Sequence, residues 1–394
     1  MLIAFLIASL STAHAEDEVK VKLYGTVKPT VALTGGAVES YGRPNESAIT
    51  AAANPRLVTD ADQAHLSWQV AQSRFGIQAD AGDAQAVLEL DFIDFNVATP
   101  TTGARPRLRQ ATVGWSATDA TTLTLGQTWD IFAPLNPLHR NLVGGSFQAG
   151  NLGFMRQQAI IDHKSKALHL SGALGLAGSN NGVSDAALEL TPRPTVAGRA
   201  AARLGDTGEV GAAGFFAKVA LSEEDLTTAW GGQLFADLKL GDKTQLRSEA
   251  FVGQNLQSTG MLTLAQARLD PTTGDIIDLQ EAGAWISLRQ GVGEGWAVTA
   301  TVNGDWVLNS EDVVANYTPA TDDSTLGVLD ATTPGMTHNA GGRVGLERKA
   351  ASHLILYGEG FGLNSAHVQA EGDPSDQGLR ATRFGGELGA VFSF

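Results

Sequence analysis

The last eight residues, ELGAVFSF (387–394), alternate between large apolar side chains and smaller or more polar ones. Leu388, Ala390, Phe392 and Phe394 share one side of the pattern, which predicts a β-strand with one apolar face. Chain ends are usually frayed and polar, whereas this chain stops on a phenylalanine. A strand of this kind needs a partner strand and apolar surroundings.

The N-terminal stretch MLIAFLIASLSTAHA (1–15) is apolar and ends in small residues. This pattern is typical of a secretory signal peptide and predicts cleavage after Ala15, which leaves residues 16–394 as a single barrel domain. The alternative is a short buried N-terminal helix, because a membrane-spanning helix needs about 20 apolar residues. The sequence contains 0 cysteines, so an exported chain of this size must be stabilised without disulfides.

The composition admits either a soluble protein or a membrane barrel. Apolar residues make up 43% of the chain, and the mean hydropathy is -0.03. A barrel reaches such values because its lipid-facing and lumen-facing residues alternate. The net charge of -15 argues against nucleic acid as a partner, since phosphates require a basic surface.

Segments with a two-residue period recur along the chain, separated by turn-like stretches. In GWAVTATVNGDWVL (295–308), for example, large apolar residues alternate with small polar ones. About sixteen such segments are expected, because the segments at 65 and 74 form one strand with a kink near Ala71–Gln72. The predicted strands begin near residues 20, 65, 84, 105, 121, 154, 167, 193, 210, 228, 244, 276, 295, 337, 352 and 379.

The connections between these segments are of two kinds. AGDA (81–84) and LGDK (240–243) are short turns, whereas residues 40–62, 256–275 and 309–337 are long and mostly polar. Short turns on one rim and long loops on the other are typical of outer-membrane barrels. The sequence therefore predicts an all-β, antiparallel transmembrane barrel of about 16 strands in the cell outer membrane. Its last strand would pair with its first, and Phe392 and Phe394 would form an interfacial anchor and assembly signal.

Arginines indicate how the lumen is lined. Arg105, Arg107 and Arg109 have i, i+2, i+4 spacing and therefore share one face of a strand. That face must point toward water, because placing an arginine at the centre of the bilayer destabilises the barrel by about 2–4 kcal/mol. Arg74 and Arg156 point inward by the same parity argument. Two interpretations stay open and are compatible: the arginines select anions, or they pair structurally with wall acids.

The acids that would pair with the arginines are also on inward faces. Glu89 and Asp91 share one face of AVLELDF, and Asp130 follows the strand that begins near 121. These carboxylates could hold the arginines in place and still leave a field across the lumen.

Residues 125–150, LGQTWDIFAPLNPLHRNLVGGSFQAG, lack alternation and contain two prolines and a Gly-Gly pair. We expect this segment, with Trp129, Asp130 and Arg140, to fold into the lumen as a constriction loop. The alternative is an ordinary surface loop.

Four short motifs make the chain resemble the DcaP-like trimeric porins of Gram-negative bacteria. They are SRFG (73–76), RLRQA (107–111), LGQTWDIF (125–132) and MRQ (155–157). The resemblance is best over residues 66–165 and implies a 16-stranded trimeric barrel, a constriction loop and passage of small organic anions such as dicarboxylates. It also implies that Arg107 and Arg109 lie at the constriction and face this loop.

No catalytic or metal-binding motif accompanies these features. The histidines are scattered, and the pair His169 and Ser171 is of a kind that alternating strands produce by chance. We therefore expect a non-enzymatic ion-transport porin without cofactor or metal, whose partners are the lipid bilayer, lipopolysaccharide and small anionic solutes. The competing hypotheses are a structural or adhesive barrel with a blocked lumen and a secreted soluble β-protein.

Overall fold

The computed structural model describes residues 18–36, 65–92, 106–140, 148–153, 155–177, 193–221, 225–270, 273–313, 336–367 and 379–394. The signal peptide predicted for residues 1–15, Arg105 and the acidic loop at 40–62 lie outside the described residues. No helix in the described ranges is long and apolar enough to cross a bilayer.

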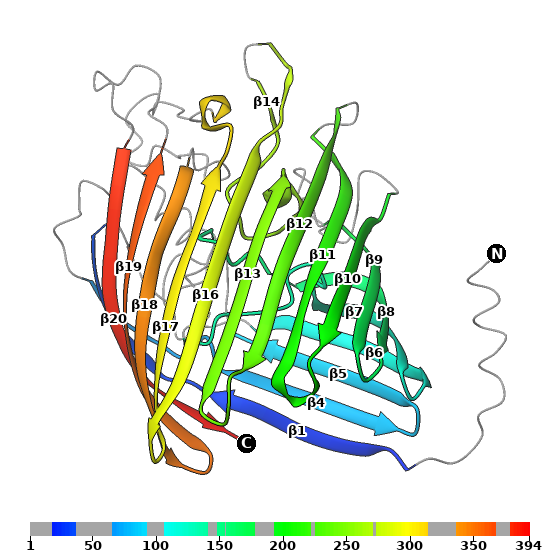
Figure 1. Cartoon of the computed structure of the whole chain (residues 1–394), viewed down its shortest axis with the longest axis vertical. Coiled ribbons are helices and arrows are strands. Elements are labelled where there is room, and N and C mark those ends of the chain that lie inside the picture. Colours follow the sequence, from blue (N-terminus) through cyan, green and yellow to red (C-terminus); the bar gives the residue numbers. More distant parts are fainter. Residues whose placement is uncertain are drawn as a thin grey trace.

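The described chain forms one large antiparallel β-sheet that closes on itself (Figure 1). Its strands are β1 (Lys20–Val27), β2 (Thr30–Gly36), β3 (His65–Gln69), β4 (Arg74–Ala81), β5 (Ala84–Asp91), β6 (Arg107–Thr118), β7 (Thr121–Trp129), β8 (Met155–Lys164), β9 (Leu168–Gly175), β10 (Thr195–Arg203), β11 (Gly208–Ala220), β12 (Leu226–Lys239), β13 (Thr244–Gln254), β16 (Gln280–Gly293), β17 (Trp296–Val307), β18 (Met336–Ala351), β19 (Leu354–His367) and β20 (Leu379–Ser393). A separate hairpin pairs β14 (Arg268–Leu269) with β15 (Ile276–Ile277), and three short 3-10 helices lie at Gly205–Thr207, Leu256–Thr259 and Ser310–Asp312.

The wall has 16 strands that run from one end of the barrel to the other, because two of them are interrupted and each is counted above as two shorter strands. β1 and β2 are separated by Lys28–Pro29, where proline cannot donate to the ladder. β3 and β4 are separated by Val70–Ser73, which contains the kink predicted near Ala71–Gln72. The predicted barrel of about 16 strands is therefore confirmed.

The wall closes where the last strand meets the first. β20 pairs with β19 on one side and with β2 and the end of β1 on the other. The backbone amide of Gly25 donates to the carbonyl oxygen of Phe394 at 3.1 Å, and the amide of Phe394 donates to the carbonyl oxygen of Gly25 at 3.1 Å. The terminal phenylalanine thus completes the ladder, as the C-terminal alternation predicts.

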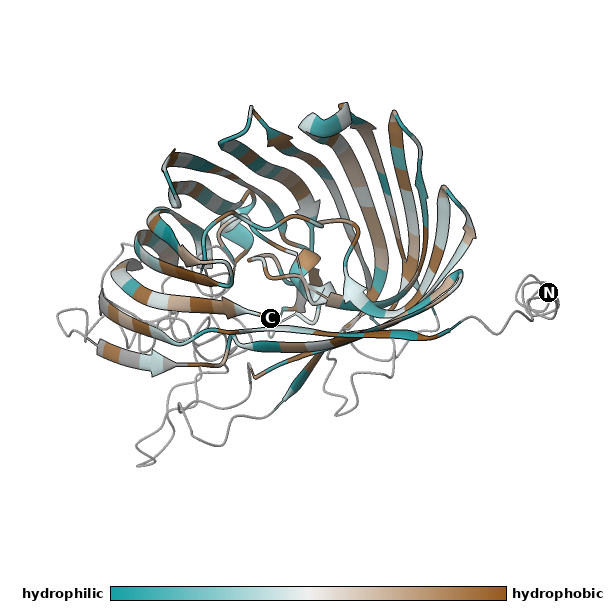
Figure 2. Cartoon of the chain, turned by 90° about the horizontal axis from the view of Figure 1, so that it is seen from below, coloured by the Kyte–Doolittle hydropathy of each residue, from teal (hydrophilic) through white to brown (hydrophobic). Residues whose placement is uncertain are grey.

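Alternation separates an apolar outside from a polar inside. Large side chains such as Leu125, Leu234, Val302 and Leu388 are all more than half exposed on the outer wall. Their neighbours in sequence point inward and are mostly polar or small, which produces the banded strands seen in Figure 2. An apolar outer wall over strands of this length fits the hydrocarbon core of a bilayer.

The predicted short turns lie together at one end of the barrel, the lower end in Figure 1, which is called the short-turn end below. They include residues 82–83, 119–120, 240–243 and 294–295. At the opposite end, most of the long connection 309–337 is outside the described residues, whereas most of 256–275 is folded. In that part Leu264 and Leu279 form a small apolar cluster with Val307 and Val313.

We predict that Phe394→Asp lowers the yield of folded barrel severalfold. The substitution places a charge at the strand end that closes the wall, where the ring is half-exposed toward lipid. Folding is measured by heat-modifiable migration on gels. The matched variant Phe394→Tyr keeps an aromatic ring and should fold as the wild type does; a normal folded yield for Phe394→Asp would show that the terminal ring is dispensable.

Candidate pore and its charged lining

In the connection between β7 and β8, the described residues 130–140 and 148–153 fold into the barrel and are called the inward loop below. Its described parts are anchored to the far wall by backbone amides. Leu135 N donates to Glu249 Oε1 of β13 at 3.0 Å, and Leu138 N donates to Ser287 Oγ of β16 at 2.9 Å. These wall groups point inward, so the predicted inward-folded loop is confirmed.

The tip of the described loop reaches still further round the wall. Arg140 Nε donates to Glu347 Oε2 of β18 at 2.5 Å, and its backbone amide donates to Glu359 of β19. The carbonyl oxygen of Arg140 accepts a bond from Lys28 Nζ at 2.6 Å. Three wall segments therefore hold one loop residue, which fixes where its guanidinium lies.

The base of the inward loop packs into an apolar cluster inside the barrel. Phe132 is fully buried, and its ring centroid lies 5.7 Å from that of Phe215 on β11. A Cβ on Gly231 would lie 2.7 Å from the Phe132 ring, so this wall position must stay small. The cluster also includes Leu152, Phe251 and Leu256, so the base of the loop packs against the inner wall.

Asp130 joins this base to the wall. Its Oδ1 accepts a bond from Phe132 N at 2.8 Å, and its Oδ2 accepts one from Arg156 Nε at 2.6 Å. Arg156 also donates to the carbonyl oxygens of Leu176 and Ala177, at 2.7 and 2.9 Å. Arg156 is therefore inward, as expected, and serves as a buried junction between the loop and β8.

The loop begins later than the sequence suggests. Residues 125–129 belong to β7, which pairs with β8 as far as Trp129↔Met155. The alternation is hard to see there because Gly126, with φ 131°, and Gln127 interrupt the apolar pattern. Trp129 is thus the last residue of a strand rather than part of the loop, and its ring centroid lies 5.4 Å from the Arg109 guanidinium.

Arg107 and Arg109 pair with the two acids that the sequence places on β5. Arg107 binds Asp91 through two bonds of 3.0 and 2.7 Å. Arg109 binds Glu89 at 2.7 Å and Asp91 at 3.0 Å. Arg74 is opposite Asp91 in the β4–β5 register, and its charged surroundings are Arg109, Glu89, Asp91 and Arg107. Structural pairing of these arginines, one of the two open interpretations, is thus present.

The two partners of these pairs are not equally accessible to the lumen. The Arg107 side chain is 20% exposed, whereas Asp91 is 0% exposed. The same holds at the loop tip, where Arg140 is 29% exposed and Glu347 is 5% exposed. In these two pairs the carboxylate lies behind the guanidinium, so water and solutes meet the positive partner. Arg109 and Glu89 are both nearly buried, with exposed fractions of 4% and 9%.

A second set of inward arginines, which were not predicted from the sequence, lies on β13, β16 and β18. Arg289 binds the other oxygen of Glu347, and Arg343 Nη1 donates to Glu359 Oε2 at 2.8 Å. Arg247 Nε lies 3.1 Å from Asp237 Oδ2. Each is an isolated arginine in an alternating strand, so the parity argument used for Arg74 would have found them.

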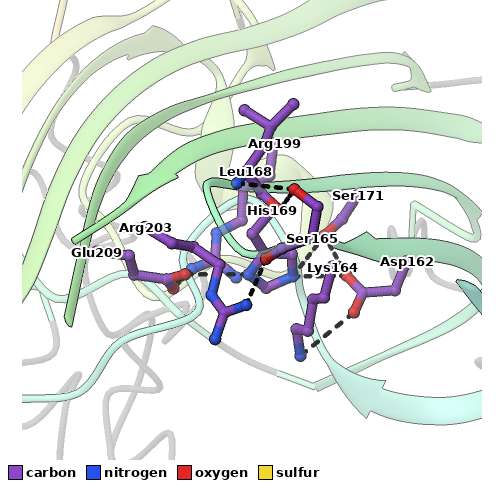
Figure 3. A network of polar contacts seen from close by, with 9 residues as sticks. All are labelled: Asp162, Lys164, Ser165, Leu168, His169, Ser171, Arg199, Arg203 and Glu209. Carbon is purple, nitrogen blue, oxygen red and sulfur yellow. Dashed lines mark hydrogen bonds and ion pairs between the residues drawn. The ribbon is translucent and has the colours of Figure 1, made fainter. Parts of the chain in front are cut away.

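His169 and Ser171 belong to a polar network on the inner wall of β8 to β11 (Figure 3). Ser171 Oγ donates to Asp162 Oδ1 at 2.5 Å, and His169 Nε2 lies 2.7 Å from the same oxygen. Ser171 Oγ and His169 Nε2 are 3.4 Å apart, and His169 Nδ1 lies 3.1 Å from Glu209 Oε2. Because the hydroxyl proton is directed to Asp162, the imidazole is not placed to accept it as a general base.

The described residues contain no group of three or more His, Cys, Asp or Glu side chains arranged to hold a metal ion.

A closed 16-stranded wall, an apolar outside, a charged inside and a loop folded through the lumen define an outer-membrane β-barrel of the porin type. The chain shares its fold with the outer membrane channel DcaP of Acinetobacter baumannii, with a TM-score of 0.69 and 14% identity over 95% of this chain and 97% of that chain. It is also similar to an anion-selective porin from Comamonas acidovorans, with a TM-score of 0.58 and 14% identity over 96% of this chain and 100% of that chain.

A third similar structure is Salmonella typhi OmpF, with a TM-score of 0.57 and 11% identity over 96% of this chain and 98% of that chain. No protein-family profile and no curated protein sequence match the chain significantly. At these identities the likeness shows a DcaP-like porin fold.

We predict that Asp130→Ala destabilises the barrel by about 3–5 kcal/mol, because it leaves the buried Arg156 charge without its carboxylate. The temperature of heat-modification on gels should fall accordingly. The double variant Asp130→Ala/Arg156→Met removes both charges and should recover much of the loss. Equal destabilisation in the single and double variants would contradict the assigned role of the ion pair.

We further predict that replacing residues 136–148 by a short glycine–serine linker raises single-channel conductance and admits larger solutes. The replacement removes the loop segment that crosses to β16, β18 and β19. Planar-bilayer recordings and liposome swelling with sugars of increasing size measure the effect. A conductance equal to that of the wild type would place the passage away from this loop.

Proposed function

We propose that this protein is a passive diffusion porin that favours small organic anions, such as dicarboxylates, and that it works as a homotrimer. Such a channel needs no cofactor, because pore width and lumen charge decide what passes. The inward loop supplies the constriction, and Arg74, Arg107, Arg109 and Arg156 supply the basic wall that faces it in this proposal.

The observation that carries the proposal is the unequal exposure within the lumen ion pairs. The accessible partners are Arg107 and Arg140, while Asp91 and Glu347 are buried behind them. A guanidinium binds carboxylate or phosphate groups through fixed paired donors, so the exposed edges of these side chains suit organic anions.

The acidic composition of the chain does not oppose this preference. Its net charge is -15, but selectivity follows the charges at the narrowest part of the passage. Charges on wet loops are screened beyond about 8 Å at physiological salt. Charges beside the inward loop lie in a narrower and less screened space, where they act more strongly on a passing ion.

Two comparisons support the proposal. The similar porin from Comamonas acidovorans is described as anion-selective, and the A. baumannii protein is described as a channel. The trimer rests on the resemblance to the DcaP-like family. A blocked structural barrel is the second candidate, because an apolar cluster that includes Phe132 and Phe215 lies inside the barrel. Conductance steps separate an open pore from a blocked one.

We predict that Arg107→Gln/Arg109→Gln moves the reversal potential in a salt gradient toward the cation equilibrium potential. The change removes two positive charges while Glu89 and Asp91 remain. Uptake of a dicarboxylate into liposomes should slow more than uptake of a neutral sugar.

The control for this experiment is Arg107→Gln/Asp91→Asn, which removes one charge of each sign and should shift the reversal potential less. A folded double-arginine variant with an unchanged reversal potential would make these arginines purely structural.

A further inference from the structure

A cavity of about 580 Å³ opens at the short-turn end of the barrel. It lies between the β10–β11 and β12–β13 turns and the inner face of β16. Its lining includes three cationic side chains, Lys239, Lys243 and Arg289, together with Gln245. Two acids of the turns, Asp206 and Asp242, also line it, and they are exposed, as Lys239 and Lys243 are.

Arg289, which lines this cavity, shares a carboxylate with Arg140 of the inward loop. Arg289 Nε donates to Glu347 Oε1 at 2.5 Å, and Arg140 Nε donates to Glu347 Oε2 at 2.5 Å. Arg289 is 38% exposed and Glu347 is 5% exposed. One buried negative charge therefore faces two accessible positive charges, which leaves a local excess of positive charge for an incoming anion.

Arg247 lies next to this site on the wall, and its partner Asp237 has a similar exposure, 27% against 30%. Arg247 is on β13, next to β16, and its register partner Ser287 is two residues before Arg289. Arg247 is held by Asp237, at 3.1 Å, and by the carbonyl oxygen of Asn136 in the inward loop, at 3.4 Å. Arg247 and Glu347 thus link the inward loop to the wall beside Arg289.

The wall formed by β8 to β11 has mixed charge at its surface (Figure 3). Asp162 and Glu209 are more exposed than His169 and Arg199, with which they pair. Lys164, which is 56% exposed, also pairs with Asp162, which is 24% exposed. Beside Arg289, in contrast, the carboxylate is buried and the positive partner is accessible, which favours the cavity as the place where an anion binds.

The cavity is separate from the arginines of β6. Arg107 is the first of the 12 residues of β6, at the end of the strand away from its short turn. Lys243 belongs to a short turn, and Arg289 is four residues from the end of β16 at its short turn. The two basic surfaces thus lie toward opposite ends of the lumen.

We propose that this cavity is a second anion subsite, which binds one carboxylate or phosphate group of a small organic solute between Arg289, Lys243 and Lys239. This subsite rests on the proposed porin function and adds a second binding position on the short-turn side of the inward loop. A solute that has passed the Arg107 surface is bound here before it leaves the barrel.

The test is block of chloride current through single channels by succinate or by inorganic phosphate, added to one side at a time. Lys243→Gln/Arg289→Gln should raise the half-blocking concentration by about threefold or more when the anion is added at the short-turn side, since two charge-assisted contacts are lost. Block from the other side should stay within twofold of the wild type.

Lys166→Gln changes a lysine of another short turn, β8–β9, and serves as the matched control with wild-type block. Lys243→Gln alone changes only an exposed turn residue and should give a smaller shift in the same direction. Orientation is set with Asp119→Cys, a single thiol at the short-turn end of an otherwise cysteine-free chain, labelled from one side. A response to succinate but not to phosphate assigns the subsite to carboxylates, and the reverse result assigns it to phosphates.

Unchanged block in the folded Lys243→Gln and double variants, in a channel whose wild type is blocked and anion-selective, overturns the subsite and leaves the porin function intact. A wild-type channel that prefers cations and shows no block from either side overturns the proposed function itself. The two failures are therefore distinguishable in one set of recordings.

Discussion

Lipid offers no hydrogen-bond partner, so every backbone group in the wall must be bonded to a neighbouring strand. The reciprocal bonds between Gly25 and Phe394 meet this requirement where the last strand, β20, pairs with the first strand, β1. Once the ring is closed, each strand has an inside and an outside, and alternation assigns every side chain to one of them. The apolar belt, the charged lumen and the inward loop all depend on this closure.

Within the closed wall, the side chains that form ion pairs include those proposed to select anions. A buried carboxylate without a cation, or a buried arginine without an acid, would cost several kcal/mol. Asp91 and Glu347 therefore need Arg107, Arg140 and Arg289 for stability. In these pairs the acids are buried in the wall and the guanidiniums are exposed to the lumen. The same pairs therefore also form a positive inner surface. Structural pairing of the arginines is thus compatible with the anion selection that we propose for them.

The sequence predicts the wall well, because a two-residue period is a local property. It predicts closure through Phe394, the kink near Ala71–Gln72, and the inward direction of Arg107, Arg109 and Arg156. It places the start of the inward loop too early, since Gly126 and Gln127 hide the end of β7. It does not predict that Arg140 meets Glu347, because residues so far apart in sequence come together only after the wall has closed.

An open pore with an accessible positive lining should let anions pass through this barrel more readily than cations. Reconstitution of the wild-type protein in a planar bilayer with a tenfold potassium chloride gradient, on the order of 0.1 against 1 M, tests this expectation most directly. We expect discrete conductance steps and a reversal potential displaced from zero toward the chloride equilibrium potential. A bilayer without steps, or a reversal potential displaced toward the potassium equilibrium potential, would contradict it.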